Sequence, residues 1–262
     1  AQESRGLGDV YKRQELAIDA SFSTAHQRLK ESCSSRDWHR DKEDPDQPET
    51  VQAMQIALNL PKQGTPARHR VLEAAARAVV SVCLDERAGG DTAFAAALGR
   101  WYGHRIRKVA RRSRNKAWND VQALPGVTVD VARAFVPSAV NEVDPLIGKL
   151  QIGHTDLPAD QPGEPLGDAP VIYVDTSLGM SAGKAAAQVG HGSMLLAAIL
   201  DTQVAWGWKQ AGFALSVREV DHATFERAEK EPGAVVVVDA GFTEIAPDSA
   251  TVCALWRPLG AQ

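Results

Sequence analysis

The chain has 262 residues, of which 44% are hydrophobic and 24% charged, with a formal net charge of −4. These values are ordinary for globular proteins, and every apolar run is shorter than a membrane span. Its three cysteines are odd in number and far apart, which argues against a disulfide framework and against a metal site. The composition predicts a cytoplasmic protein of one large or two modest domains, with no metal and no cofactor.

Little ordered structure is expected in the first 50 residues. Residues 1–14 (AQESRGLGDVYKRQ) show no apolar periodicity and resemble a translated adapter more than native protein. Residues 15–29 fit a short helix, whereas residues 31–51 are rich in acidic residues and prolines, which is typical of a mobile connector. We therefore expect a disordered or non-native segment over residues 1–50.

A smaller α+β domain is predicted over residues 51–154. Small apolar residues at helical spacing follow Pro66, and turn residues separate the remaining segments. The predicted elements are a strand or short helix over residues 54–60, helices over 67–86 and 92–124, a hairpin over 127–136 and a helix over 141–152. This order loosely resembles that of the second half, but no repeated motif supports a duplication.

Positive charge is concentrated in the predicted helix over residues 92–124. Residues 104–118 contain seven Lys and Arg and no acid. Either this is a solvated face balanced by acids elsewhere, or it contacts a phosphate backbone. We favour the second interpretation because residues 170–262 hold six basic residues against ten acidic ones, which suits a polyanion poorly. The residues predicted to bind substrate there are Arg105, Lys108, Arg111, Arg112 and Lys116.

Residues 155–169 are proline-rich and are predicted to be a linker. Beyond it, alternating strands and helices predict a three-layer α/β sandwich around a four-stranded mixed sheet over residues 170–262. The predicted strands cover residues 171–174, 213–220, 234–238 and 251–256, and the third is expected to be central because it is wholly apolar.

A loop rich in glycine and serine, residues 176–183, connects the first of these strands to a helix. Such a loop aims backbone N–H groups and a helix N-terminus at an anion. Lys184, Gln188 and His191 follow at spacings that place them on one helix face. The segment is not a P-loop, because Leu178 stands where that motif needs glycine. On spacing alone, an anion site and a structural role for His191 both stay open.

Two segments resemble type 2 peptidyl-tRNA hydrolases. The first is the pattern Leu178-x-Met180-x-x-Gly183-Lys184-x-Ala186-Ala187-Gln188-x-x-His191. The second is residues 239–247 (DAGFTEIAP) with Thr251 in the strand beyond, similar to that family's Asp-Ala-Gly-Arg-Thr block. The chain departs from the family at three positions: Asp175 and Ser177 stand where Arg and Asp are usual, and Phe242 where Arg is usual.

The resemblance implies hydrolysis of the ester between a peptide and the 3′-terminal ribose of tRNA, which recycles tRNA from stalled translation. Because that ester is activated, a placed water, a base and oxyanion stabilisation suffice, without metal or covalent intermediate. Asp239 would orient water or a lysine, and Lys184 would stabilise the oxyanion or bind phosphates. The implied catalytic residues are Lys184, Asp239, Thr243 and Thr251, and the implied substrate-binding residues are Gly183, Gln188 and His191.

Two other hypotheses stay open because of the three departures. The chain could be a catalytically inactive tRNA- or RNA-binding protein of the same fold, or an esterase for another carboxyl ester. Asp239 could equally cap a turn, and Thr243 could satisfy loop backbone. The resemblance also implies a homodimer, although the extra domain could occupy the dimer surface.

Overall fold

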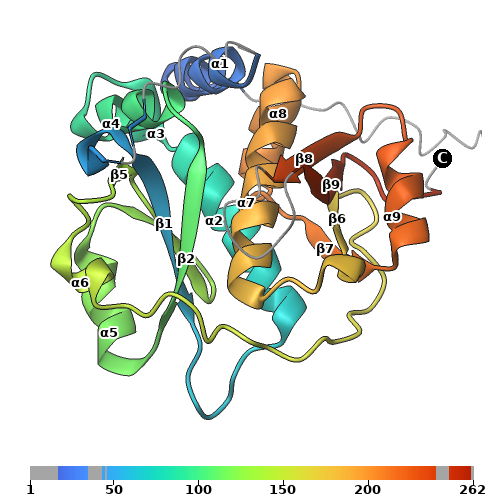
Figure 1. Cartoon of the computed structure of the whole chain (residues 1–262). Coiled ribbons are helices and arrows are strands. Elements are labelled where there is room, and N and C mark those ends of the chain that lie inside the picture. The colour runs from blue at the N-terminus through green and yellow to red at the C-terminus, as the bar shows by residue number, and fades with distance from the viewer. Residues whose placement is uncertain (1–16, 35–42, 45, 240–247, 261–262) are drawn as a thin grey trace, which may run out of the picture.

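A computed structural model describes residues 17–34, 43, 44, 46–239 and 248–260. They form two mixed sheets, with a pair of helices between the sheets and other helices outside them (Figure 1). The predicted α/β class is confirmed. None of the helices in these ranges has the length and hydrophobicity that crossing a membrane requires.

The first sheet, sheet A, has the strand order β2-β1-β4-β3. Strand β1 is parallel to β2 and antiparallel to β4, and β4 is antiparallel to β3; the short β5 also pairs with β1. Because β1 is central, it is buried along nearly its whole length. The strands are β1 (Gln52–Asn59), β2 (Arg107–Ser113), β3 (Gly126–Val129), β4 (Ala132–Phe135) and β5 (Ser138–Ala139).

Helix α2 (Arg68–Cys83) covers one face of sheet A, because its small apolar residues recur at helical spacing and are buried. The opposite face packs on Val121, Ile147 and Leu150, which belong to the segments around α5 and α6. The remaining helices of this half are α1 (Ala20–Ser34), α3 (Glu86–Gly89), α4 (Ala93–Tyr102), α5 (Asn115–Asp120) and α6 (Pro145–Gly148), with short 3-10 turns at Pro48–Thr50 and Val121–Ala123.

The long basic helix predicted over residues 92–124 is wrong. Helix α4 ends at Tyr102, and the basic residues that follow form the edge strand β2. This strand pairs in parallel with β1 from Ala53–Arg107 to Asn59–Ser113. Long basic side chains favour a helix only weakly, so the tertiary pairing with a buried strand decides the conformation.

The second sheet, sheet B, has the order β7-β6-β9-β8. Strand β6 is parallel to β7, and β9 is antiparallel to both β6 and β8, so the predicted four-stranded mixed sheet is confirmed. The predicted central place of residues 234–238 is wrong: β8 lies at the edge, and Val238 is 56% exposed. The strands are β6 (Val171–Asp175), β7 (Ser216–Val220), β8 (Val235–Asp239) and β9 (Ser249–Leu255).

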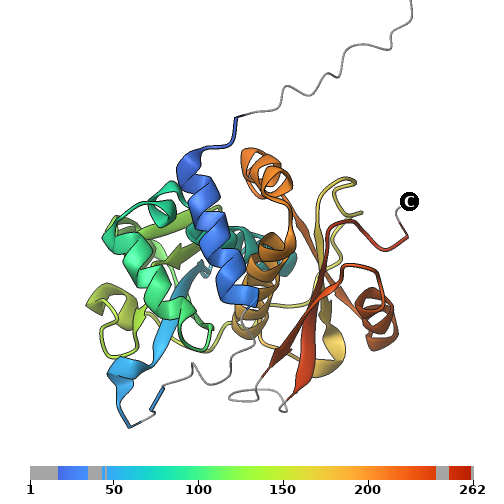
Figure 2. The same ribbon diagram turned by 90° about the horizontal axis from the view of Figure 1, so that it is seen from above.

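Sheet B has helices on both faces (Figure 2). Helix α7 (Ala182–Ile199) packs on β6, β8 and β9, and α9 (His222–Glu229) covers the other face through Phe225 and Ala228. Helix α8 (Thr202–Gln210) follows α7. A 3-10 turn, Thr176–Leu178, precedes α7.

Helices α2 and α7 pack against each other between the two sheets (Figure 1). A single apolar core therefore includes side chains from both halves of the chain. Helix α1 contacts α3, α4, α7 and α8, and His26 on it hydrogen-bonds the Ala197 carbonyl at 2.8 Å. The two halves thus share one continuous interior.

Candidate active site

Three elements of sheet B end or begin at the same edge. Strands β6 and β8 both run antiparallel to β9, so their carboxyl ends coincide, and α7 starts there after the loop that follows β6. Asp239 is the last residue of β8, Lys184 is the third residue of α7, and Thr251 lies near the start of β9. Strands β6 and β8 are not adjacent, because β9 separates them.

This edge brings together four of the predicted residues. Lys184 Nζ lies 2.5 Å from Asp239 Oδ2, and Gln188 Nε2 donates to the same oxygen at 2.5 Å. The Thr251 hydroxyl lies 3.1 Å from Gln188 Oε1 and 3.1 Å from the Val237 carbonyl oxygen. Because the Gln188 carbonyl side faces a hydroxyl, its NH₂ group is directed at the carboxylate.

The cluster is largely shielded from solvent. The side chains of Lys184 and Asp239 are 13% and 9% exposed, and Thr251 is fully buried. Charge-assisted hydrogen bonds are strong in such surroundings, where the effective dielectric constant is lower than in water. The arrangement therefore holds an ammonium group in a fixed position beside a helix N-terminus, where it can stabilise a developing oxyanion.

Two of the first three N–H groups of α7, those of Gly183 and Lys184, are bonded within the protein. Gly183 N donates to Thr155 Oγ1 at 2.9 Å, and Lys184 N donates to Ser181 Oγ at 3.2 Å. A Cβ at position 183 would lie 2.7 Å from Thr155 Oγ1, so any other residue there would displace the Thr155 side chain. The anion site that spacing suggested is therefore not supported at Gly183, whose N–H already has a partner.

Thr155 had no sequence signal, since it stands in the proline-rich segment predicted to be a linker. It is 2% exposed. Replacing Thr155 by valine is expected to lower the free energy of unfolding by about 1–3 kcal/mol, because the buried Gly183 N–H loses its acceptor. Urea denaturation measures this, with Thr155→Ser as the control that keeps the hydroxyl; equal losses in both variants would contradict the assignment.

Residues 169–259 match the family model of peptidyl-tRNA hydrolase PTH2. This region holds sheet B, helices α7 to α9 and the Lys184–Asp239 cluster. The predicted resemblance is confirmed for this region, and no family model matches the part of the chain before it. No curated protein and no solved structure matches the chain.

His191, the third residue of the predicted helix face, stands apart from the cluster. Within the described residues it has no hydrogen bond to Lys184, Gln188 or Asp239. Burial lowers its pKa well below the ordinary value, and the charge of nearby Lys108 lowers it further. His191 is therefore neutral at neutral pH. Thr243 and Phe242, the other PTH2 positions of interest, lie outside the described residues.

The basic residues predicted to bind substrate do not form one exposed surface, because Lys108 and Arg111 contact the protein interior. Lys108 Nζ is buried over the Trp101 ring at 5.0 Å, and burial lowers its pKa from 10.5 to about 8. Arg111 donates to Gln55 Oε1 at 2.7 Å and to the Leu150 carbonyl at 3.0 Å.

The other three basic residues differ from these two in their surroundings. Arg112 hydrogen-bonds Gln151, which lies just beyond α6. Lys116 is 86% exposed and pairs with Asp120, and Arg105 is also exposed. Two of the five predicted contacts, Arg105 and Lys116, therefore keep exposed side chains.

Asp175, which stands where PTH2 proteins usually have arginine, accepts hydrogen bonds from neighbouring residues at the end of β6. Its side chain is 2% exposed and accepts from Ser177 N at 2.9 Å and from His222 Nδ1 at 2.7 Å. Burial alone would raise the pKa of Asp175, but these hydrogen bonds lower it below its ordinary value. The same contact raises the pKa of His222.

Replacing Asp175 by asparagine is expected to return the pKa of His222 toward 6.5, because the hydrogen bond to a carboxylate raises it in the folded protein. The stabilisation by the His222 cation is complete below pH 6.5 and is lost as pH rises through the raised pKa. An NMR titration of the His222 ring measures the change. An unchanged titration midpoint in the variant would show that Asp175 is not its cause.

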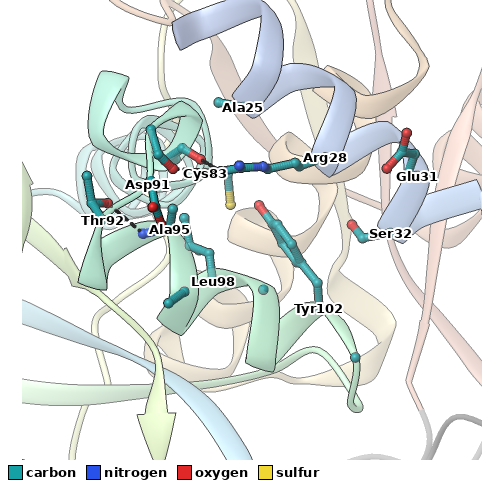
Figure 3. Close-up of a pocket in the computed structure, with 15 residues that line it drawn as sticks. Ala25, Arg28, Glu31, Ser32, Cys83, Asp91, Thr92, Ala95, Leu98 and Tyr102 are labelled. Carbon is teal, nitrogen blue, oxygen red and sulfur yellow. Dashed lines mark hydrogen bonds between the residues drawn. The ribbon is translucent and has the colours of Figure 1, made fainter.

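A cavity of about 690 Å³ lies between α1 and α4, away from this site (Figure 3). Arg28, Cys83, Leu98 and Tyr102 are among the residues that line it. Arg28 is occupied by the carbonyl oxygens of Ala88 and Gly90. No described residue that was predicted for catalysis or substrate binding contributes to this cavity.

Proposed function

We propose that the chain is a peptidyl-tRNA hydrolase that cleaves the ester between a peptide and the 3′-terminal ribose of tRNA. The observation that carries the proposal is the Lys184–Asp239–Gln188 cluster within the residues that match PTH2. Such an enzyme acts in the cytoplasm and returns tRNA from stalled translation.

In the proposed reaction, water attacks the ester carbonyl carbon and the bond from that carbon to the ribose oxygen breaks. The proton lost by the water is balanced by the proton that the ribose oxygen takes up. Lys184 stabilises the oxyanion of the tetrahedral intermediate. Asp239 orients Lys184, while Gln188 and Thr251 keep the carboxylate in place.

Substrate binding in this proposal rests on phosphate contacts outside the acidic PTH2 region. Arg105 and Lys116 in the first half have exposed side chains. In this proposal they contact the phosphate backbone of the tRNA. Contacts of this kind are insensitive to sequence and weaken steeply with salt. Neutral replacement of both should reduce tRNA affinity at low salt more than at high salt.

The experiment is release of N-acetyl-amino acid from N-acetyl-aminoacyl-tRNA, beside retention of deacylated tRNA at low salt. Release that accelerates with enzyme concentration supports the proposal. Retention without release favours the inactive RNA-binding protein. That alternative is supported by Asp175, which stands where the family usually has arginine. Neither release nor retention, with cleavage of a simple carboxyl ester, favours the esterase.

A further inference from the structure

The two halves of the chain have the same topology. Sheet A has the order β2-β1-β4-β3 and sheet B the order β7-β6-β9-β8, with a parallel first pair and two antiparallel pairs in each. Along the chain, residues 52–135 and 171–255 both run strand, helix, helix, strand, helix, strand, strand, apart from the short α3 in the first. Outside these ranges the first half also has α1, β5 and α6, which have no counterpart among the described elements of the second half. Helix α2 thus corresponds to α7, α4 to α8, and α5 to α9.

The contact between the halves is reciprocal. Gly190, the ninth residue of α7, approaches Val79, the twelfth residue of α2, so closely that a Cβ would lie 2.7 Å from Val79 Cγ2. Ser193, the twelfth residue of α7, donates to the carbonyl of Ala76, the ninth residue of α2, at 2.7 Å. In both contacts the ninth residue of one helix meets the twelfth residue of the other. Such an exchange of equivalent positions is the mark of an isologous interface in a two-fold dimer.

The same reciprocity holds between helices and strands. Helix α7 also packs on β2, and α2 packs on β7. Glu73 of α2 accepts from Val217 N on β7 at 3.0 Å, while the Lys108 side chain of β2 lies against α7 at Gly190. The pseudo-two-fold relation therefore extends beyond the helix pair to both sheets.

A second ion pair stands at the position that corresponds to Lys184–Asp239. Arg70 is the third residue of α2, as Lys184 is of α7, and Asp130 directly follows β3, the counterpart of β8. Arg70 Nε lies 2.6 Å from Asp130 Oδ2, and Arg70 Nη2 lies 2.7 Å from Oδ1. A basic residue at the helix start thus meets an acid at the strand end in both halves.

The second pair lacks the surroundings of the first. Arg70 and Asp130 are 55% and 38% exposed, against 13% and 9% for Lys184 and Asp239. Ala74 stands where α7 has Gln188, so α2 has no amide side chain at that position to hold the carboxylate. Only two residues connect β3 to β4, whereas a longer segment connects β8 to β9. A solvated pair of this kind gives weak electrostatic stabilisation.

We infer that residues 52–135 are a second, diverged copy of the fold formed by residues 171–255, docked on it across a pseudo-two-fold axis as a partner subunit would be, with one complete site in the pair. The first half then covers the face of α7 that packs on α2 and β2. The chain is accordingly a monomer, in which the pairing of its two halves replaces the homodimer that the family resemblance implied.

The docking is tested by light scattering and thermal unfolding of the full chain. We expect the mass of one chain, 28.1 kDa, at all protein concentrations. Gly190→Leu should lower the melting temperature by about 2–10 °C, because the larger side chain intrudes on Val79. Gly207→Leu is the matched control, since the space beside Gly207 on α8 is open. Twice the mass, or an unchanged melting temperature for Gly190→Leu, overturns the inference.

The silent second site is tested by peptide release, an arm that rests on the proposed function. Arg70→Met should keep the wild-type rate, because an exposed pair without the amide contributes nothing to the reaction. A rate reduced as far as in Lys184→Met overturns the claim of one complete site. If the wild type releases no peptide, the mass and melting-temperature results still decide the docking.

Discussion

Replacement of Lys184 by methionine is expected to lower kcat/KM for peptidyl-tRNA hydrolysis by about 100- to 1000-fold, the usual effect of removing an oxyanion stabiliser. The ammonium is 2.5 Å from Asp239 and only 13% exposed, so neither water nor another side chain of the cluster substitutes for its charge. Single-turnover release of peptide from N-acetyl-aminoacyl-tRNA measures the effect on the chemical step.

Two controls accompany this variant. Lys184→Arg keeps the positive charge and should retain part of the rate, although its planar group fits the Asp239 oxygen differently. Arg70→Met removes the equivalent charge from the first half and should leave the rate unchanged. A Lys184→Met enzyme that stays folded and works within about threefold of the wild type would remove Lys184 from the mechanism.

Replacement of Lys108 by methionine is expected to stabilise the protein at neutral pH by up to about 3 kcal/mol. The buried Nζ has no hydrogen-bond partner among the described residues, and its pKa falls from 10.5 to about 8. Between these two values the unfolded chain binds more protons than the folded one, so stability rises with pH over that window. Methionine keeps the length of the side chain without the charge.

The stabilisation by Lys108→Met should therefore shrink as pH approaches 10.5, where the wild-type amine is neutral in both states. Urea denaturation at pH 7 and pH 10 measures the difference in unfolding free energy. Lys116→Met is the matched control, because that side chain is 86% exposed and its replacement should change stability by less than about 0.5 kcal/mol. A destabilised Lys108→Met protein at pH 7 would show that the buried charge is compensated.

The grouping of residues in the C-terminal candidate site was largely predictable because these residues follow local rules. A strand, a glycine loop and an Ala-rich helix place Lys184 and Gln188 on one face, and the family pattern brings in Asp239 and Thr251. The expected place of β8 failed, because an apolar β-branched run does not distinguish an edge strand from a central one. The role of Thr155 could not be predicted, because it depends on a hydrogen bond with Gly183, which is distant along the chain.

The first half was harder to predict because non-local pairing decides its structure. The segment around Lys108 has no strand alternation, and it becomes a strand only beside the buried β1. The sequence indicated the internal symmetry only through a loosely similar order of predicted elements, because Arg70 stands where α7 has Lys184 and Ala74 where it has Gln188, and no motif repeats. The similarity of the two halves is visible in their strand order and in the reciprocal contacts of α2 and α7, but not in their amino-acid sequences.

The most direct test of the account compares single-turnover peptide release by Asp239→Asn and Asp130→Asn. Both variants remove one carboxylate charge at the end of corresponding strands, but only Asp239 holds Lys184 in the shielded cluster. We predict a loss of about 100-fold for Asp239→Asn and a wild-type rate for Asp130→Asn. Equal rates for the two variants would contradict the assignment of hydrolysis to the Lys184–Asp239 site.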